Sequence, residues 1–288
     1  MKKLIALSLA ILLLTGCTAA AYDGPTESAW VRTEMTTTQY DAFTGESQTR
    51  LQTIRYDILG NPVHNSFYTD GELTAEHKNT YDEHGNCIRE VTWNHLWFFS
   101  YPVSRTSYTY DQQGRLLTTT YRNGLGIKTG ADTYTYDDEA NTITWVGTYD
   151  TQIKYLDENG ELLRVVTDSR PAGMEMDTRY EYDKLGRNTR ILQYLDGELS
   201  MTTEQRFDDR DRVIESTMYD ANGAIISRHT WEYTENTVTT WDMDGYKSVK
   251  TLRPDGQPEK NETYGPDGKL RTRTDYTYTE IQIPAKEE

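Results

Sequence analysis

The aromatic residues of one short segment are the strongest candidates for a binding site. The stretch WNHLWFFSYP, residues 93 to 102, contains Trp93, Trp97, Phe98, Phe99 and Tyr101. Exposed aromatic patches mark surfaces that bind partners, and aromatic rings are prominent among residues that dominate binding energy. We therefore predict that these five side chains bind a carbohydrate or a protein. The alternative is that the segment folds over the sheet and covers apolar surface that would otherwise be exposed.

The sequence shows no catalytic constellation. It contains no GxSxG motif, no HExxH motif and no glycine-rich phosphate loop. The five histidines are scattered along the chain: His64, His77, His84, His95 and His229. The segment DMDG, residues 242 to 245, looks like part of a calcium loop but lacks the glutamate that completes an EF-hand. We therefore expect no enzyme, no metal site and no cofactor.

The first residues have the form of an export signal. MKK is basic, LIALSLAILLL is apolar but too short for a stable membrane span, and LTGC follows at residues 14 to 17. This pattern resembles the lipobox of bacterial lipoproteins, which implies cleavage after Gly16 and a lipid on the thiol of Cys17. We expect residues 1–16 to be a signal peptide, Cys17 to be a membrane anchor and residues 17–29 to be a tether. The predicted location is extracytoplasmic, on a bacterial cell membrane.

The charge of the chain excludes one class of partner. The sequence has 46 acidic and 30 basic residues, a formal charge of −16, and removal of Lys2 and Lys3 leaves 28 basic residues. No basic stripe is present that could neutralise phosphates, so we expect no nucleic-acid partner. Beyond Cys17 the only thiol is Cys87, which leaves no internal disulfide.

The elements that position the aromatic segment are set by regularly spaced turns. In DQQG an aspartate and a glycine lie three positions apart, the spacing of a type I turn followed by a left-handed residue, which closes a β-hairpin. The same spacing recurs at these places: Asp57–Gly60, Asp82–Gly85, Asp157–Gly160, Asp183–Gly186, Asp220–Gly223 and Asp242–Gly245. At Asp208–Asp211 an aspartate takes the glycine place, which Asp tolerates better than most residues.

A second kind of turn alternates with the first. Asp70-Gly71, Asn123-Gly124 and Asp196-Gly197 are dipeptides that suit two-residue type I′ hairpins. The distance from Tyr56 to Tyr81 is 25 positions, so a fixed period contains two chain reversals and predicts one hairpin per repeat. We expect roughly 16 to 20 strands of about nine residues.

Tyrosines precede these turns in pairs spaced by two, such as Tyr108 with Tyr110 and Tyr180 with Tyr182. Each pair projects from one face of its strand, and stacking between hairpins predicts an aromatic ladder. The motifs YDQQGRL, YDKLGR and YDEHGN resemble the YD repeats of the RHS family, from about Tyr40 to Tyr278. That resemblance implies a long coiled sheet of hairpins. The resemblance does not imply a toxin. The chain is too short to form a closed shell around a toxin, and the segment IQIPAKEE has no toxin-like features.

The predicted fold is all-β: an antiparallel meander of repeated hairpins that forms one long, twisted and curved sheet over residues 30–283, with residues 284–288 as a tail. The sheet's ends need covering against edge pairing. An outer-membrane barrel is disfavoured because strands such as RNTRILQYL place charges where a continuous apolar band is needed. The predicted function is that of a membrane-anchored, surface-exposed, non-catalytic binding lipoprotein. The alternatives are a cell-envelope polysaccharide hydrolase and a structural spacer.

Overall fold

The computed structural model describes residues 26–41, 44–96, 99–169 and 172–284, which form twenty β-strands. The strands are β1 Thr26–Tyr40, β2 Ser47–Tyr56, β3 Pro62–Thr69, β4 Glu72–Tyr81, β5 Cys87–Leu96, β6 Phe99–Tyr110, β7 Leu116–Asn123, β8 Lys128–Asp137, β9 Thr142–Val146, β10 Asp150–Leu156, β11 Leu162–Ser169, β12 Met174–Tyr182, β13 Asn188–Leu195, β14 Glu198–Phe207, β15 Val213–Asp220, β16 Ile225–Tyr233, β17 Thr237–Asp242, β18 Lys247–Leu252, β19 Pro258–Tyr264 and β20 Leu270–Pro284.

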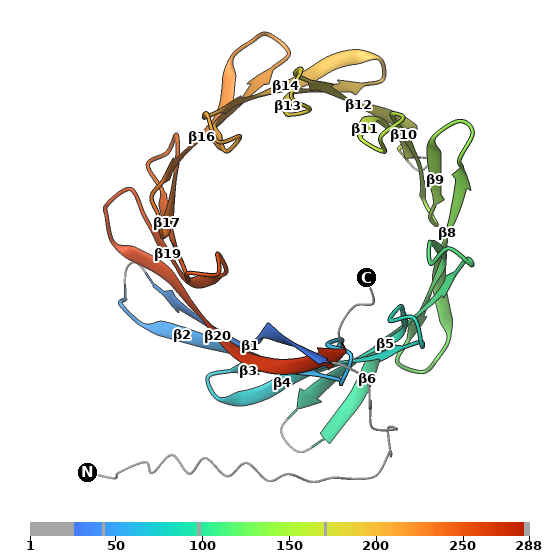
Figure 1. The fold of residues 1–288 in the computed structure, drawn as a ribbon, viewed down its shortest axis with the longest axis vertical. Coiled ribbons are helices and arrows are strands. Elements are labelled where there is room, and N and C mark those ends of the chain that lie inside the picture. The colour runs from blue at the N-terminus through green and yellow to red at the C-terminus, as the bar shows by residue number, and fades with distance from the viewer. Residues whose placement is uncertain (1–25, 42–43, 97–98, 170–171, 285–288) are drawn as a thin grey trace.

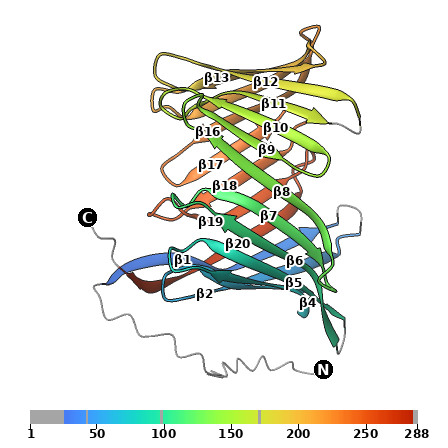
Figure 2. The same ribbon diagram turned by 90° about the vertical axis from the view of Figure 1, so that its right-hand side faces the viewer.

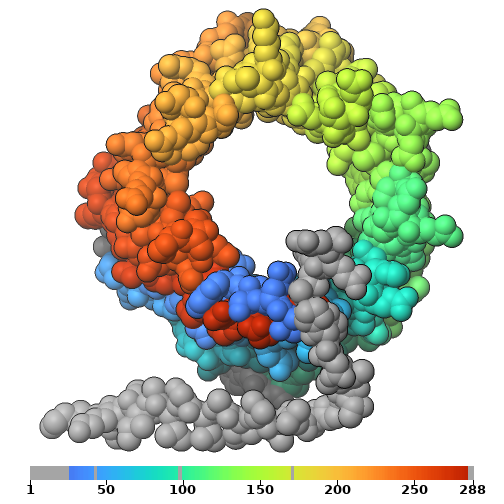
Figure 3. All heavy atoms as spheres, viewed as in Figure 1, coloured from blue at the N-terminus to red at the C-terminus, as the bar shows by residue number. Residues whose placement is uncertain are grey.

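The strands form one closed barrel. Each strand pairs antiparallel with the next, and β1 also pairs with β20, from Thr26 opposite Pro284 to Gln39 opposite Thr272. Figures 1 and 2 show the ring from two directions, and Figure 3 shows that its centre stays open when all heavy atoms are drawn. The predicted antiparallel meander and its strand number are therefore confirmed. The expectation of sheet ends that need covering is wrong, because the curvature of twenty strands brings the last against the first and removes both edges.

The Asp-x-x-Gly turns have the predicted geometry. At the β12–β13 turn the Gly186 N–H donates to the Asp183 carbonyl at 3.0 Å. The Asp183 carboxylate accepts the N–H groups of Leu185 at 2.8 Å and Arg187 at 3.1 Å. Gly186 has φ 77°, a conformation that favours a residue without a Cβ. Each such aspartate therefore holds its own hairpin closed through backbone donors.

One of the predicted two-residue turns is wrong. Asp70 and Gly71 have φ values of 50° and 87°, as a type I′ turn requires, and Asp196-Gly197 is similar. At the third dipeptide, however, Asn123 acts as the aspartate does elsewhere: its side-chain oxygen accepts the N–H groups of Leu125 and Ile127. Gly126, at φ 83°, takes the left-handed place. The sequence offers a glycine three positions after Asn123, and the longer turn uses it.

The two faces of the sheet differ in chemistry. Across β12 and β13, Tyr180 lies opposite Ile191, whereas the next residue, Glu181, lies opposite Arg190. Since neighbouring residues of a strand alternate between faces, one face collects the tyrosines and the other collects ion pairs. We call them the tyrosine face and the charged face. The tyrosine face also carries Asp132, so neither face of the described strands is a continuous apolar band.

The tyrosines connect successive hairpins through their hydroxyls rather than through stacked rings. Each of six tyrosine hydroxyls donates to the carbonyl of a residue just after the preceding turn: Tyr81 to Pro62, Tyr110 to Cys87, Tyr136 to Leu116, Tyr182 to Leu162, Tyr233 to Val213 and Tyr278 to Pro258, at 2.7–3.0 Å. The ring contacts found among the described residues join none of these tyrosines to one another. The predicted aromatic ladder is therefore wrong, because an Arg guanidinium occupies the face of several of these rings instead.

Several expectations fall outside the described residues. These are the signal peptide over 1–16, the lipid site at Cys17, most of the tether and residues 285–288. The first strand begins at Thr26, four residues before the expected start of the domain, and the last strand ends at Pro284. Over the ranges that the structure covers, no helix has the length and apolar character to span a bilayer.

Candidate functional site

The predicted aromatic segment is divided between the two faces of the barrel. Trp97 and Phe98 lie outside the described residues. On β5 Trp93 lies opposite Glu76, on the charged face. Tyr101 lies opposite Asn94 and therefore points to the other face, because Asn94 is the neighbour of Trp93 in β5. The sequence grouped these residues by proximity along the chain, but the sheet separates Trp93 from Tyr101.

The start of β6 leaves aromatic rings exposed. Phe99 is 54% exposed and Tyr101 is 39% exposed, and their ring centroids lie 6.1 Å apart. Leu96 is exposed beside them at the end of β5. This pair is accessible to a partner, and its role in binding stays a prediction.

A titratable cluster surrounds Trp93 on the charged face. The Glu76 carboxylate accepts hydrogen bonds from His64 Nε2 at 2.6 Å and His95 Nε2 at 2.9 Å, and Lys78 Nζ lies 3.6 Å from it. The Lys78 ammonium also lies 5.6 Å from the Trp93 ring centroid. We call His64, Glu76, Lys78 and His95 the Glu76 cluster. The side chains of Glu76 and His64 are only 14% and 13% exposed.

Within the Glu76 cluster, the carboxyl of Glu76 is held ionised and the imidazole of His64 is held neutral. Burial opposes ionisation of Glu76, but the charges of Lys78 and His64 and the two histidine hydrogen bonds lower its pKa overall. The pKa of His64 is lowered, mainly because burial disfavours the imidazolium and secondarily because Arg55 lies beside it. A carboxyl that ionises this readily is a poor general acid. Within the described ranges, no group of three or more His, Cys, Asp or Glu side chains is arranged to hold a metal ion.

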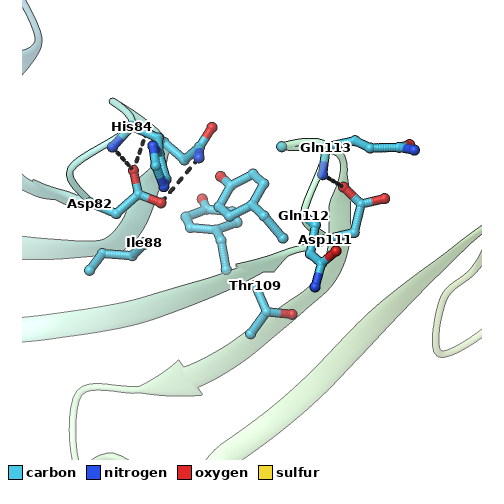
Figure 4. Close-up of a pocket in the computed structure, with 11 residues that line it drawn as sticks. Asp82, His84, Ile88, Thr109, Asp111, Gln112 and Gln113 are labelled. Carbon is cyan, nitrogen blue, oxygen red and sulfur yellow. Dashed lines mark hydrogen bonds between the residues drawn. The ribbon is translucent and has the colours of Figure 1, made fainter.

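A cavity of about 680 Å³ opens at the rim of the barrel between two successive turns, β4–β5 and β6–β7 (Figure 4). We call this cavity the rim pocket. Its lining includes Asp82, His84, Asn86, Tyr108, Tyr110 and Gln112. The rings of Tyr108 and Tyr110 come from β6, and the polar groups come from the two turns. Ligand sites commonly combine an apolar or aromatic surface with a few convergent polar groups, as this pocket does.

Hydrogen bonds hold the wall of the rim pocket in place. One carboxylate oxygen of Asp82 accepts the N–H groups of His84 at 2.9 Å and Asn86 at 2.8 Å, and the other accepts the Asn86 side-chain amide at 3.1 Å. These bonds, the amide first, lower the pKa of Asp82. Burial raises the pKa of Tyr108 and Tyr110, so both phenols stay protonated at neutral pH. The His84 side chain is largely exposed at the pocket mouth, as expected from its place in a turn.

Sequence reasoning missed the rim pocket. The pocket depends on Asn86 and Tyr110, which are brought together only when two hairpins pair. A signal was present, however, in the residue that follows the turn glycine or its substitute, which is Asn61 and Asn86 in two successive repeats but Arg115, Arg187 and Arg212 in others. Comparing that position among the repeats would have separated the turns with a short asparagine from those with a long arginine.

The fold defines the class: a closed antiparallel β-barrel of hairpin repeats with a polar and aromatic pocket at one rim. A family with the description "Uncharacterised protein" matches residues 30–162. No curated protein matches the chain.

Solved structures resemble the chain only distantly. TcdB2-TccC3 without its hypervariable C-terminal region has 12% identity and a TM-score of 0.37 over 79% of this chain, which spans only 15% of that protein's length. A porin-like protein from Bacteroides uniformis has 12% identity and a TM-score of 0.40, covering 86% of this chain and 98% of its own. A porin-like protein from Bacteroides vulgatus has a TM-score of 0.23 at the same identity, covering 86% and 99%. These likenesses are too distant to carry an argument about function.

Proposed function

We propose that the protein is a lipid-anchored, surface-exposed, non-catalytic binding protein of a bacterial cell envelope, and that its ligand is a carbohydrate or a protein. The observation that carries this proposal is the rim pocket, where Tyr108 and Tyr110 provide aromatic surface and Asp82, Asn86 and Gln112 provide hydrogen-bonding groups. Such a pocket suits a ligand with both flat and polar parts. The exposed pair Phe99 and Tyr101 offers a second contact surface.

The anchor rests on the lipobox that ends at Cys17. The chemistry of the barrel supports a body outside the bilayer, since charged side chains lie on both faces of the described strands, with Arg164 and Asp177 on one and Asp132 on the other. A spanning barrel needs an apolar outer band. Mass spectrometry of the mature N terminus tests the anchor directly. A barrel that partitions into detergent even as a Cys17→Ser variant would contradict it.

The YD-repeat resemblance supports the same proposal at the level of architecture. The Tyr-Asp-x-x-Gly segments form turns and inter-hairpin bonds, as at Tyr182 and Asp183. Because the repeated residues are used to build the fold, we expect ligands to bind at positions where the repeats differ. Asn86 is one such position. Membership of the RHS group remains part of the proposal.

Binding can be tested with a variant that fills the pocket. The purified barrel is screened against a glycan array and against envelope proteins, and Asn86→Arg is compared with Asn222→Arg, a substitution of the same charge at an exposed turn on β15–β16. We expect Asn86→Arg to abolish the binding and Asn222→Arg to preserve it. Binding that survives Asn86→Arg but is lost in a Phe99→Ala, Tyr101→Ala double variant would move the site to β6. No binding in any assay would favour a structural spacer.

The hydrolase alternative meets an obstacle in the acids of the pocket. A glycosidase needs one carboxyl that is protonated at working pH. Asn86 lowers the pKa of Asp82, and Arg115 lowers the pKa of Asp111, so both acids are held ionised. We therefore expect no turnover in a hydrolysis screen on envelope polysaccharides. Turnover that is lost in Asp82→Asn would overturn the non-catalytic proposal.

A further inference from the structure

An arginine side chain recurs at one position between successive turns. The Nε atoms of Arg115, Arg187 and Arg212 donate to the aspartates of their own turns at 2.7, 2.7 and 2.8 Å: Asp111, Asp183 and Asp208 respectively. The same guanidinium groups lie over an aromatic ring of the next repeat: Tyr136 at 4.4 Å, Phe207 at 5.0 Å and Tyr233 at 4.3 Å from the centroid. The spaces between these turns are therefore filled by a guanidinium on an aromatic surface.

The outer edge of this guanidinium meets the following turn. Arg115 Nη1 donates to Asp138 at 2.7 Å, and Arg187 Nη1 donates to Asp211 at 2.9 Å. A planar fork with several donors can contact one carboxylate, an aromatic face and a second polar group at once. The repeat therefore shows, within the chain itself, which chemical group fits between two of its turns.

The rim pocket is the corresponding space one repeat earlier, with Asn86 in place of the arginine. The Asn86 amide reaches Asp82 as the arginines reach their aspartates, but it is too short to extend over the next ring. In the part of the chain that the structure describes, no cation lies over Tyr110. Gln112 occupies the position that Asp138 holds in the next repeat and lines the cavity.

We propose that the rim pocket binds a guanidinium group, supplied by an arginine side chain of a partner protein. The guanidinium stacks on Tyr110 and donates to Asp82 and to the side-chain oxygen of Gln112, as Arg115 does with its own neighbours. This inference rests on the proposed binding function and specifies its ligand. The formal charge of −16 favours a partner with a basic surface. Lysine fits less well, because an ammonium has neither the planar face nor the fork.

The experiment compares two capped pentapeptides that differ only in a central Arg or Lys, titrated calorimetrically into the whole barrel at low ionic strength. We expect the Arg peptide to bind about tenfold more tightly than the Lys peptide, the difference that a favourable stacked contact supplies. Asn86→Arg should remove this binding, because the new side chain fills the pocket as Arg115 fills the next one. Asn222→Arg should change the affinity less than about twofold, since it adds the same charge elsewhere.

A reverse variant tests the same idea without relying on Asn86→Arg. Replacing Arg115 by Asn should open a further pocket over Tyr136 and raise the number of Arg peptides bound by one. Equal binding of Lys and Arg, or Arg binding unaffected by Asn86→Arg, would overturn the inference. Glycan binding that Asn86→Arg abolishes, with no preference for Arg, would overturn it while leaving the proposed function intact. If neither peptides, glycans nor envelope proteins bind, the proposed function falls as well.

Discussion

The hydroxyl of Tyr110 donates a 2.8 Å hydrogen bond to the backbone carbonyl of Cys87, which lies just after the preceding turn. This bond ties the last residue of β6 to the first residue of β5, and so joins the β6–β7 hairpin to the β4–β5 hairpin before it. The barrel has a single layer of sheet, and among the described residues Ile54, at 8% exposure, is the only buried apolar side chain. Stability must therefore come from the strand ladders and from repeated contacts of this kind rather than from a central apolar core.

Removing one such hydroxyl should weaken the barrel measurably. We expect Tyr182→Phe or Tyr233→Phe to lower the free energy of unfolding by about 1 kcal/mol, because the carbonyl of Leu162 or Val213 loses its partner. Urea denaturation gives the change. Tyr149→Phe is the control: Tyr149 is 67% exposed, and its loss should cost less than about 0.5 kcal/mol. Equal losses at all three positions would contradict a structural role for the bonds.

Acid should loosen the turns. The Arg212 side chain, with the backbone of Arg212, lowers the pKa of Asp208 to about 2. A folded-state pKa below that of the unfolded chain contributes stability above about pH 4, and this contribution is lost as the pH falls through the folded value. We expect the melting temperature to drop between about pH 4 and pH 2, and we expect Asp208→Asn to flatten that drop. A drop of the same size in Asp208→Asn would show that other groups cause it.

The Glu76 cluster should make the barrel sensitive to milder acid. The pKa of His64 is lowered by burial and by Arg55, so the unfolded chain takes up this proton at a higher pH than the folded one. The neutral imidazole then stabilises the fold above about pH 6.5, and the contribution is lost as the pH falls through the lowered value. Proton NMR of His64 measures the titration directly. Glu76→Gln should lower the His64 pKa further, because the carboxylate charge favours the imidazolium. A His64 pKa at or above that of free histidine would contradict the assignment.

The aromatic segment should separate into structural and accessible residues. Trp93 is partly buried and packs beside Lys78, so Trp93→Ala should cost about 1 to 3 kcal/mol of stability. The double variant Phe99→Ala, Tyr101→Ala should cost less than about 1 kcal/mol, because both rings are exposed. Thermal melts of the two variants make the comparison. A larger loss in the double variant would mean that the start of β6 packs against residues outside the described ranges.

Local features of this fold follow from the sequence. The spacing of Asp183 and Gly186 is enough to predict the turn, since the carboxylate and the glycine act within five residues of each other. The pairing of Tyr180 with Tyr182 on one face follows from the two-residue period of a strand. The turn at Asn123 was harder, because two glycines, Gly124 and Gly126, offered competing geometries.

Closure and the rim pocket could not be predicted in the same way. Closure depends on the sum of many small strand twists, so the pairing of Thr26 with Pro284 has no local signal. The rim pocket exists because the Asn86 side chain is too short to cover the ring of Tyr110. The sequence does not show this, because the two residues come together only when their hairpins pair. The Glu76 cluster likewise draws His64 and His95 from strands on either side of β4.

The pairing of β1 with β20 imposes an order on folding. Hairpins such as β12–β13 can form early, because their contacts are close in sequence. The seam between Thr37 and Thr274 spans 237 positions, so the chain-entropy cost of joining it is met last. Until then β1 is paired only with β2, and its other edge has no partner strand. A molecule that stalls before β20 forms therefore exposes two unpaired strand edges, at β1 and β19, and such edges favour association between chains.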